Sequence, residues 1–169
     1  MVTIVLATAV AVVAAQRVLE LRLARRNELW AREQGAVEHG ASHYPLFFML
    51  HGGWLVGLVV EAWVRDGLAA LWPVWLAAFV LAQALRYWAI ASLGRRWNTR
   101  VLVLPGAALV RTGPYHWLRH PNYVAVVIEL ASLPLVFGAV WTAAIAGVLN
   151  LALLLGVRIP CENRALSSS

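Results

Sequence analysis

A polar cluster at residues 113–123, with the sequence GPYHWLRHPNY, carries the side chains best suited to chemistry in this chain. Pro121 fits the first turn of a helix, where a missing N–H costs nothing, so His120 and the free amides beside it lie at a helix N-terminus. Such an end favours an anionic group, for example a carboxylate. The alternative is an interfacial belt, in which Tyr and Trp lie at headgroup depth and Arg contacts lipid phosphate.

A second polar cluster, residues 158–164, follows the last apolar run. Arg158 and Glu162 are four residues apart and would share one face of a helix, although Pro160 disturbs that helix. Taken alone, this cluster favours the simpler interpretation, a stop signal of interfacial charge. If the two preceding apolar runs form a hairpin, both clusters meet at one face of the membrane, which favours a site.

The segments of the chain outside these two clusters are mostly apolar. Hydrophobic residues make up 62% of the 169 residues and charged residues only 13%, whereas soluble domains contain roughly a quarter charged residues. This composition excludes an ordinary soluble protein, and the length predicts one domain over residues 1–169. The basic residues lie between apolar runs, so we expect no nucleic-acid partner. Cys161 is the only cysteine, which excludes an internal disulfide and a cysteine-rich metal site.

Five apolar stretches are close to the length of about 20 residues that a membrane span requires. They are residues 2–19, 44–64, 71–93, 123–138 and 139–157. The first could be mistaken for a signal peptide, but it lacks a basic n-region, and we interpret it as a retained span. The last two abut and predict a tight antiparallel hairpin that turns near Gly138. The predicted fold is an all-α integral membrane protein with five transmembrane helices, a C-terminal helical hairpin and a cytoplasmic cofactor pocket.

The arginines predict the orientation. All basic residues are Arg, and all but Arg65 fall on one side of the predicted membrane. Because basic residues concentrate in cytoplasmic loops, we expect the N-terminus outside and the C-terminus in the cytoplasm. Two cytoplasmic segments are long: residues 20–43 begin as a helix that breaks at Gly35 and Gly40, and residues 94–119 contain a short extended run at 101–104.

Two polar side chains are predicted to be buried in the hairpin. Glu129 lies eight residues from Pro121 and Asn150 eight residues from Arg158, which is about 12 Å along each helix. The hairpin therefore places them level with each other, and a carboxylate there requires a partner or a cavity. Either they hydrogen-bond to each other, or they lie beneath the site as its polar lining. No metal site is predicted from the histidine spacing.

The two polar clusters, residues 113–123 and 158–164, resemble motifs of the isoprenylcysteine carboxyl methyltransferase family of integral membrane methyltransferases. The motif is Arg119-His120-Pro121-Asn122-Tyr123, preceded by Gly113-Pro114-Tyr115 and followed one hairpin later by Arg158 and Glu162. The resemblance covers residues 95–166. The N-terminal half is similar to small bacterial members, some of which are associated with type III polyketide synthases and methylate alkylpyrones or related phenolic lipids. The resemblance to these members implies a bacterial inner (plasma) membrane protein, with a polyketide synthase as a pathway neighbour.

The resemblance implies a cytoplasmic pocket for S-adenosylmethionine (SAM). By similarity its residues are Arg100, Ala107, Ala108, Leu109, Val110, Tyr115, His120, Pro121, Asn122, Tyr123 and Glu162. Arg158 matches the family arginine that faces the substrate. The family usually has two adjacent glutamates near the end, whereas the second position here is Asn163, a departure that argues against prenylcysteine as the acceptor.

The expected activity is SAM-dependent O-methylation of a carboxylate or acidic hydroxyl on a lipophilic acceptor, alkylpyrone-like or prenylcysteine-like, that enters from the bilayer. An ionised acceptor needs no base; Arg158 would hold it, with Asn98 or Arg100 as helpers. A phenol would need a base, for which His120 and Glu129 are candidates. The alternatives are a non-enzymatic membrane scaffold and a membrane reductase of the sterol-reductase type, although those reductases are much larger.

Overall fold

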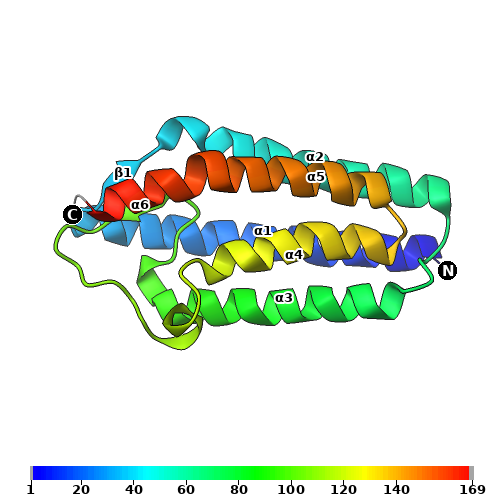
Figure 1. The fold of residues 1–169 in the computed structure, drawn as a ribbon, viewed down its shortest axis with the longest axis horizontal. Coiled ribbons are helices and arrows are strands. Elements are labelled where there is room, and N and C mark those ends of the chain that lie inside the picture. Colours follow the sequence, from blue (N-terminus) through cyan, green and yellow to red (C-terminus); the bar gives the residue numbers. More distant parts are fainter. Residues whose placement is uncertain (1, 168–169) are drawn as a thin grey trace.

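The computed structural model describes residues 2–167 and shows helices that run side by side along one axis (Figure 1). The helices are α1 (Val2–Glu33), α2 (Tyr44–Arg65), α3 (Trp72–Leu93), α4 (Pro121–Val136), α5 (Val140–Leu153) and α6 (Ile159–Ser167). A π-helical turn, Leu154–Arg158, joins α5 to α6. Three short 3₁₀ helices lie in the connections: Ala41–His43, Gly94–Arg96 and Gly113–His116.

Four helices of the described chain are long and apolar enough to cross a membrane: residues 2–33, 41–65, 72–96 and 140–167. Many of their large apolar side chains are exposed, as expected for helices whose solvent is lipid. The predicted fifth span corresponds to α4, which is apolar but only 16 residues long. The all-helical class is therefore confirmed, with four candidate membrane spans and one shorter apolar helix.

The predicted C-terminal hairpin is present in the described chain. Gly138 has φ +67° between α4 and α5, a conformation that costs glycine little, and the Ala139 amide donates to Pro134 O at 2.9 Å. From α2, the Glu61 carboxylate accepts hydrogen bonds from the first amides of α5, Trp141 at 3.1 Å and Thr142 at 2.7 Å. Acidic groups at a helix N-terminus are stabilising, which explains the charge in this apolar helix.

The two long connections meet through a small sheet. Strands β1 (Val37–His39) and β2 (Val101–Val103) pair antiparallel, with Val37 opposite Val103. The extended run that the sequence predicts at 101–104 is thus confirmed for three residues, although its partner strand was not predicted. Gly35 and Gly40 have φ +83° and +63° after the end of α1, as the predicted breaks require.

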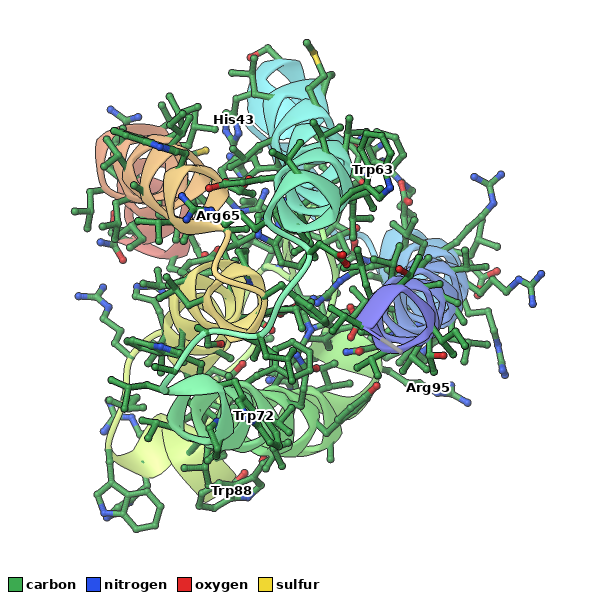
Figure 2. All side chains as sticks on the ribbon, turned by 90° about the vertical axis from the view of Figure 1, so that its right-hand side faces the viewer. His43, Trp63, Arg65, Trp72, Trp88 and Arg95 are labelled. Carbon is green, nitrogen blue, oxygen red and sulfur yellow. The ribbon has the colours of Figure 1, made fainter. Side chains whose placement is uncertain are left out.

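Helix α4 lies between α3 and α5 when the bundle is viewed end-on, with α1 at the edge (Figure 2). Its buried face contributes Leu130 and Leu133 to the main apolar core, together with Leu58 of α2 and Phe137. The indole of Trp54 donates to Leu130 O at 3.0 Å and so ties α2 to α4. The N-terminus of α4 in turn contacts Arg158 and Glu162, which follow α5.

A cluster of four charged side chains fills the space between α1, α3 and α4; we call it the charged quartet. It consists of Arg17, Glu20, Arg86 and Glu129. The Arg86 guanidinium donates twice to Glu20, at 2.9 and 2.7 Å, and also approaches Glu129 at 3.4 Å. Arg17 forms ion pairs with both glutamates. Such intramembrane charges are tolerated when they pair with one another.

Both alternatives for Glu129 and Asn150 are wrong, because the two side chains neither hydrogen-bond to each other nor line the large cavity at the end of the bundle. Glu129 instead accepts hydrogen bonds from Arg17 and Arg86, which lie on helix faces that point at α4. A guanidinium binds a carboxylate more strongly than a neutral amide does. Asn150 is fully buried, and neither its Oδ1 nor its Nδ2 has a hydrogen-bond partner in the described part of the chain.

Candidate active site

A cavity of about 720 Å³ opens at the end of the bundle where α1 and α3 end and α4 begins. The long connections and the C-terminal α6 gather at this same end (Figure 1). The volume is within the range typical of small-molecule sites. Its lining comes from residues 96–98, 100–104, 107–111 and 115–120, from the start of α4, and from Arg158 and the face of α6 that follows it.

Most residues predicted for the site line this cavity. They are Asn98, Arg100, Ala107, Ala108, Leu109, Val110, Tyr115, His120, Asn122, Tyr123, Arg158 and Glu162. Pro121 does not line it; it is the buried first residue of α4. Glu129 does not line it either, because its carboxylate is bound within the charged quartet.

The start of α4 supplies polar atoms that have no partner. His120 is the N-cap residue, and its imidazole is stacked on the Tyr123 ring with 5.2 Å between centroids. His120 Nε2 and Asn122 Oδ1 are buried, and neither has a hydrogen-bond partner among residues 2–167. A buried polar atom without a partner is costly. Both residues line the cavity, so a bound ligand that reached these two atoms would supply the partners they lack.

The hairpin brings Arg158 and Glu162 beside α4, as the sequence predicts. The Tyr123 hydroxyl donates to Glu162 and accepts from Arg158 Nε at 3.1 Å. Arg158 Nη2 donates to Thr99 O at 2.8 Å. Tyr123 therefore links the Glu162 carboxylate to the Arg158 guanidinium, which are four residues apart along the chain.

The π-helical turn accounts for the position of Arg158. Pro160 has no N–H for the carbonyl of Gly156, and its ring would collide with that carbonyl in a regular α-helix. The wider turn at Leu154–Arg158 accommodates the proline while the helix continues to Ser167. Such π-turns occur often at functional sites, and this one ends on the arginine that lines the cavity.

Arg158 is a buried cation without an acidic partner. Its side chain lies over the Phe47 ring, 5.8 Å from the centroid, and the residue is only 7% exposed. In the described chain no carboxylate lies within 4 Å of its guanidinium. Buried charges in proteins are normally paired, so this one fits an anionic ligand.

Two titratable groups in the cavity are shifted toward their neutral forms. Burial lowers the pKa of His120, and Arg119 acts in the same direction, while Glu162 opposes them. The imidazole is therefore neutral at pH 7 and can donate one hydrogen bond and accept another. Burial, together with the charge of Glu162, raises the pKa of Tyr115, whose hydroxyl stays protonated.

Asn98 and Arg100 are occupied by contacts within the protein. Asn98 Nδ2 donates to Ala24 O at 2.9 Å, and its Oδ1 accepts from the Arg100 amide at 2.9 Å. The Arg100 guanidinium donates to Glu38 at 2.6 Å and lies 4.3 Å from the Tyr44 ring centroid. These contacts join the cavity lining to α1, β1 and α2, so both residues position the cavity.

Several lining residues were not predicted. They are Arg96, Trp97, Val101–Leu104, Arg111, His116, Trp117, Leu118, Arg119 and Leu166, with Ala31 and Leu93 at the edge. Arg96 Nη1 donates to Ala108 O at 2.7 Å and holds the 107–111 loop. The excess of arginine in residues 94–119 was the signal that could have identified Arg96, Arg111 and Arg119.

The class of protein is an all-helical bundle, with helices of membrane-spanning length and a cavity at one end that polar, charged and apolar side chains line together. Comparison with known families shows which family the chain belongs to. Residues 75–168, more than half of the chain, match the isoprenylcysteine carboxyl methyltransferase (ICMT) family. The chain belongs to this family of methyltransferases, as the sequence motif predicted.

Two bacterial relatives align over nearly their whole length. A protein of Bacillus subtilis (strain 168), described as "Uncharacterized protein YpbQ", is 41% identical over 158 residues, which are 93% of this chain and 94% of the relative. A Haemophilus influenzae (strain ATCC 51907 / DSM 11121 / KW20 / Rd) protein, described as "Uncharacterized protein", is 28% identical over 93% of this chain and 92% of its own. No solved structure matches the chain.

Proposed function

We propose that the protein is a SAM-dependent O-methyltransferase whose acceptor is a lipophilic molecule with an ionised head, a carboxylate or an acidic hydroxyl. The observation that carries the proposal is Arg158, a buried guanidinium without a carboxylate partner in the described chain, beside the His120 and Glu162 groups. Membership of the ICMT family supports methyl transfer. An alkylpyrone-like or a prenylcysteine-like lipid would both meet this description.

The residues near α4 fit the methyl donor. SAM supplies a methyl group on a positively charged sulfur and carries a carboxylate and an ammonium. Glu162 matches the ammonium, and the positive end of the α4 dipole matches the carboxylate, although the Tyr123 and Val124 amides already donate to His120 O. His120 Nε2 and Asn122 Oδ1, which have no partner within residues 2–167, provide a further donor or acceptor each.

The acceptor side rests on Arg158. The acceptor oxygen forms a bond to the methyl carbon, the carbon–sulfur bond breaks, and its electron pair stays on sulfur. An acceptor that arrives ionised has no proton to lose, so no general base is required. Alignment of oxygen, carbon and sulfur then provides most of the rate enhancement. Arg158 holds the anion by a charge-assisted hydrogen bond from its planar guanidinium.

We further propose that α4 is a fifth span and that the cavity faces the cytoplasm of a bacterium, where SAM is made. The arginine-rich segments 95–100, 111–119 and 158–164 belong to the cavity end, whereas Arg65 ends α2 next to the N-terminal side of α3. The positive-inside rule then favours an inner membrane protein with its N-terminus outside. A polyketide synthase that makes the acceptor is the pathway neighbour that this function favours.

Cys161 provides a test of this orientation. It is the only cysteine, and it is partly exposed in α6, close to the cavity. A membrane-impermeant maleimide is expected to label it in inside-out vesicles and not in intact cells, and Cys161→Ser is the control for specificity. Labelling from outside intact cells would contradict the proposed topology.

Substitutions on the donor side should weaken SAM binding. His120→Ala and Glu162→Gln each remove a polar partner of the proposed ligand, and loss of a charge-assisted hydrogen bond typically costs about 1.5–3 kcal/mol. We therefore expect the dissociation constant for SAM, measured by calorimetry in detergent, to rise roughly ten- to hundredfold in each. Glu33→Gln, at the exposed end of α1, is the matched control. Unchanged affinity in both variants would place the donor site elsewhere.

A further inference from the structure

The cavity lining carries far more positive than negative charge. Five arginines line it, Arg96, Arg100, Arg111, Arg119 and Arg158, but only one carboxylate, that of Glu162. Arg100 is balanced from outside the cavity by Glu38 at 2.6 Å and Glu28 at 3.6 Å. In residues 2–167, the other four have no carboxylate within 4 Å.

This excess charge affects the two substrates in opposite ways. The methyl donor carries a fixed positive charge on sulfur, so the four unbalanced arginines repel it, while they attract an anionic acceptor. Like charges repel more strongly near a protein surface than in bulk water, because the effective dielectric constant is lower there. The summed repulsion from several arginines therefore changes binding measurably, and it weakens when salt screens it.

We propose that the acceptor anion and SAM bind cooperatively, because the acceptor charge offsets the repulsion between the cavity arginines and the sulfonium. This inference rests on the proposed function and adds to it that the charges of the two substrates couple their binding. Methyl transfer removes the negative charge of the acceptor oxygen and the positive charge of the donor sulfur together. The neutral acceptor product then loses its attraction to Arg158, which favours its release into the bilayer.

SAM and S-adenosylhomocysteine (SAH) should differ in this cooperativity, because SAH has the same amino acid and nucleoside groups but a neutral sulfur. Cooperativity of electrostatic origin is expected with SAM and not with SAH. A packing contact between acceptor and donor would instead act on both ligands. Comparison of the two therefore separates charge from contact.

The test is the dissociation constant of SAM and of SAH for the detergent-solubilised protein, with laurate as the anionic probe and dodecanol as its neutral counterpart. Laurate is expected to tighten SAM binding by about fivefold or more, the lower end of usual coupling between sites. It should leave SAH binding almost unchanged, and dodecanol should affect neither. The laurate effect should decrease between about 0.05 M and about 0.5 M NaCl.

Variants at the cavity mouth provide the control for charge. Arg111 and Arg119 are exposed and line the cavity, so Arg111→Gln/Arg119→Gln should bind SAM more tightly without laurate and show a smaller laurate effect. Arg22→Gln/Arg25→Gln removes the same charge from the exposed face of α1, away from the cavity, and should behave like the unaltered protein. Equal effects in the two double variants would overturn the proposal.

The anion could also come from a lipid headgroup, and bilayer composition distinguishes this source. In nanodiscs of phosphatidylcholine, laurate should still tighten SAM binding. Equal tightening by phosphatidylglycerol alone would assign the anion to a headgroup and contradict an acceptor at this position. SAM binding without any laurate effect would overturn the cooperativity and leave the proposed function standing, whereas no SAM binding under any condition would overturn the proposed function itself.

Discussion

The Arg158→Ala variant is expected to lose methyl transfer by two orders of magnitude or more, while it still binds SAM. Removal of a donor that stabilises charge in the transition state typically costs about 10²–10³ in rate, and Arg158 is the cation most buried in the cavity lining. Arg158→Lys retains the charge but loses the planar fork that reaches Thr99 O and the Tyr123 hydroxyl together. We therefore expect an intermediate rate. The measurement is methyl transfer to an alkylpyrone or prenylcysteine analogue, beside SAM affinity.

The control for this experiment is Arg25→Ala, which removes an exposed arginine from α1 without altering the cavity lining and should retain full activity. SAM affinity separates the two possible roles of Arg158. If Arg158→Ala abolished SAM binding, Arg158 would belong to the donor site, and the partner of the acceptor would have to be sought elsewhere, beginning with Arg100.

Substitution of Arg86 by leucine is expected to destabilise the protein strongly. Arg86 is 6% exposed and binds both glutamates of the charged quartet. Its removal leaves one carboxylate charge uncompensated in the bundle, and loss of one partner of a buried ion pair costs about 3–5 kcal/mol. Thermal denaturation in detergent should show a large decrease in the midpoint temperature.

The double variant Glu20→Leu/Arg86→Leu tests whether charge balance is the cause. It removes the bidentate pair and retains the pair of Arg17 and Glu129, so the quartet region stays neutral. Replacement of a whole buried pair by apolar residues is often neutral or stabilising. The double variant should therefore be more stable than Arg86→Leu alone; a double variant less stable than the single one would show that packing, not charge, dominates here.

The helices and the meeting of the two polar clusters could be predicted from the sequence. Apolar runs of span length specify helices without long-range information, because a backbone in lipid must satisfy its hydrogen bonds within each helix. The abutting runs and Gly138 specify the hairpin, and the hairpin brings Arg158 and Glu162 to the start of α4. The candidate site follows from this geometry, and twelve of its predicted residues line the cavity.

The partners of the buried polar groups could not be predicted. The sequence predicts that the hairpin places Glu129 and Asn150 level, but the partners of Glu129 come from α1 and α3, whose rotation about their own axes depends on packing. For the same reason, the sequence does not predict the pairing of β1 with β2 or the engagement of Asn98 with Ala24 O. The fifth span stays a prediction, since α4 is apolar but, at 16 residues, shorter than the four helices that are long enough to cross a membrane.

Titration of SAM into the purified protein tests the central claim most directly, with NADPH titrated under the same conditions. The account predicts that SAM binds at one site per chain, that SAH competes for it, and that NADPH does not bind. Binding of NADPH without SAM would indicate a reductase, and binding of neither would indicate a membrane scaffold; either result would contradict a methyltransferase site in this cavity.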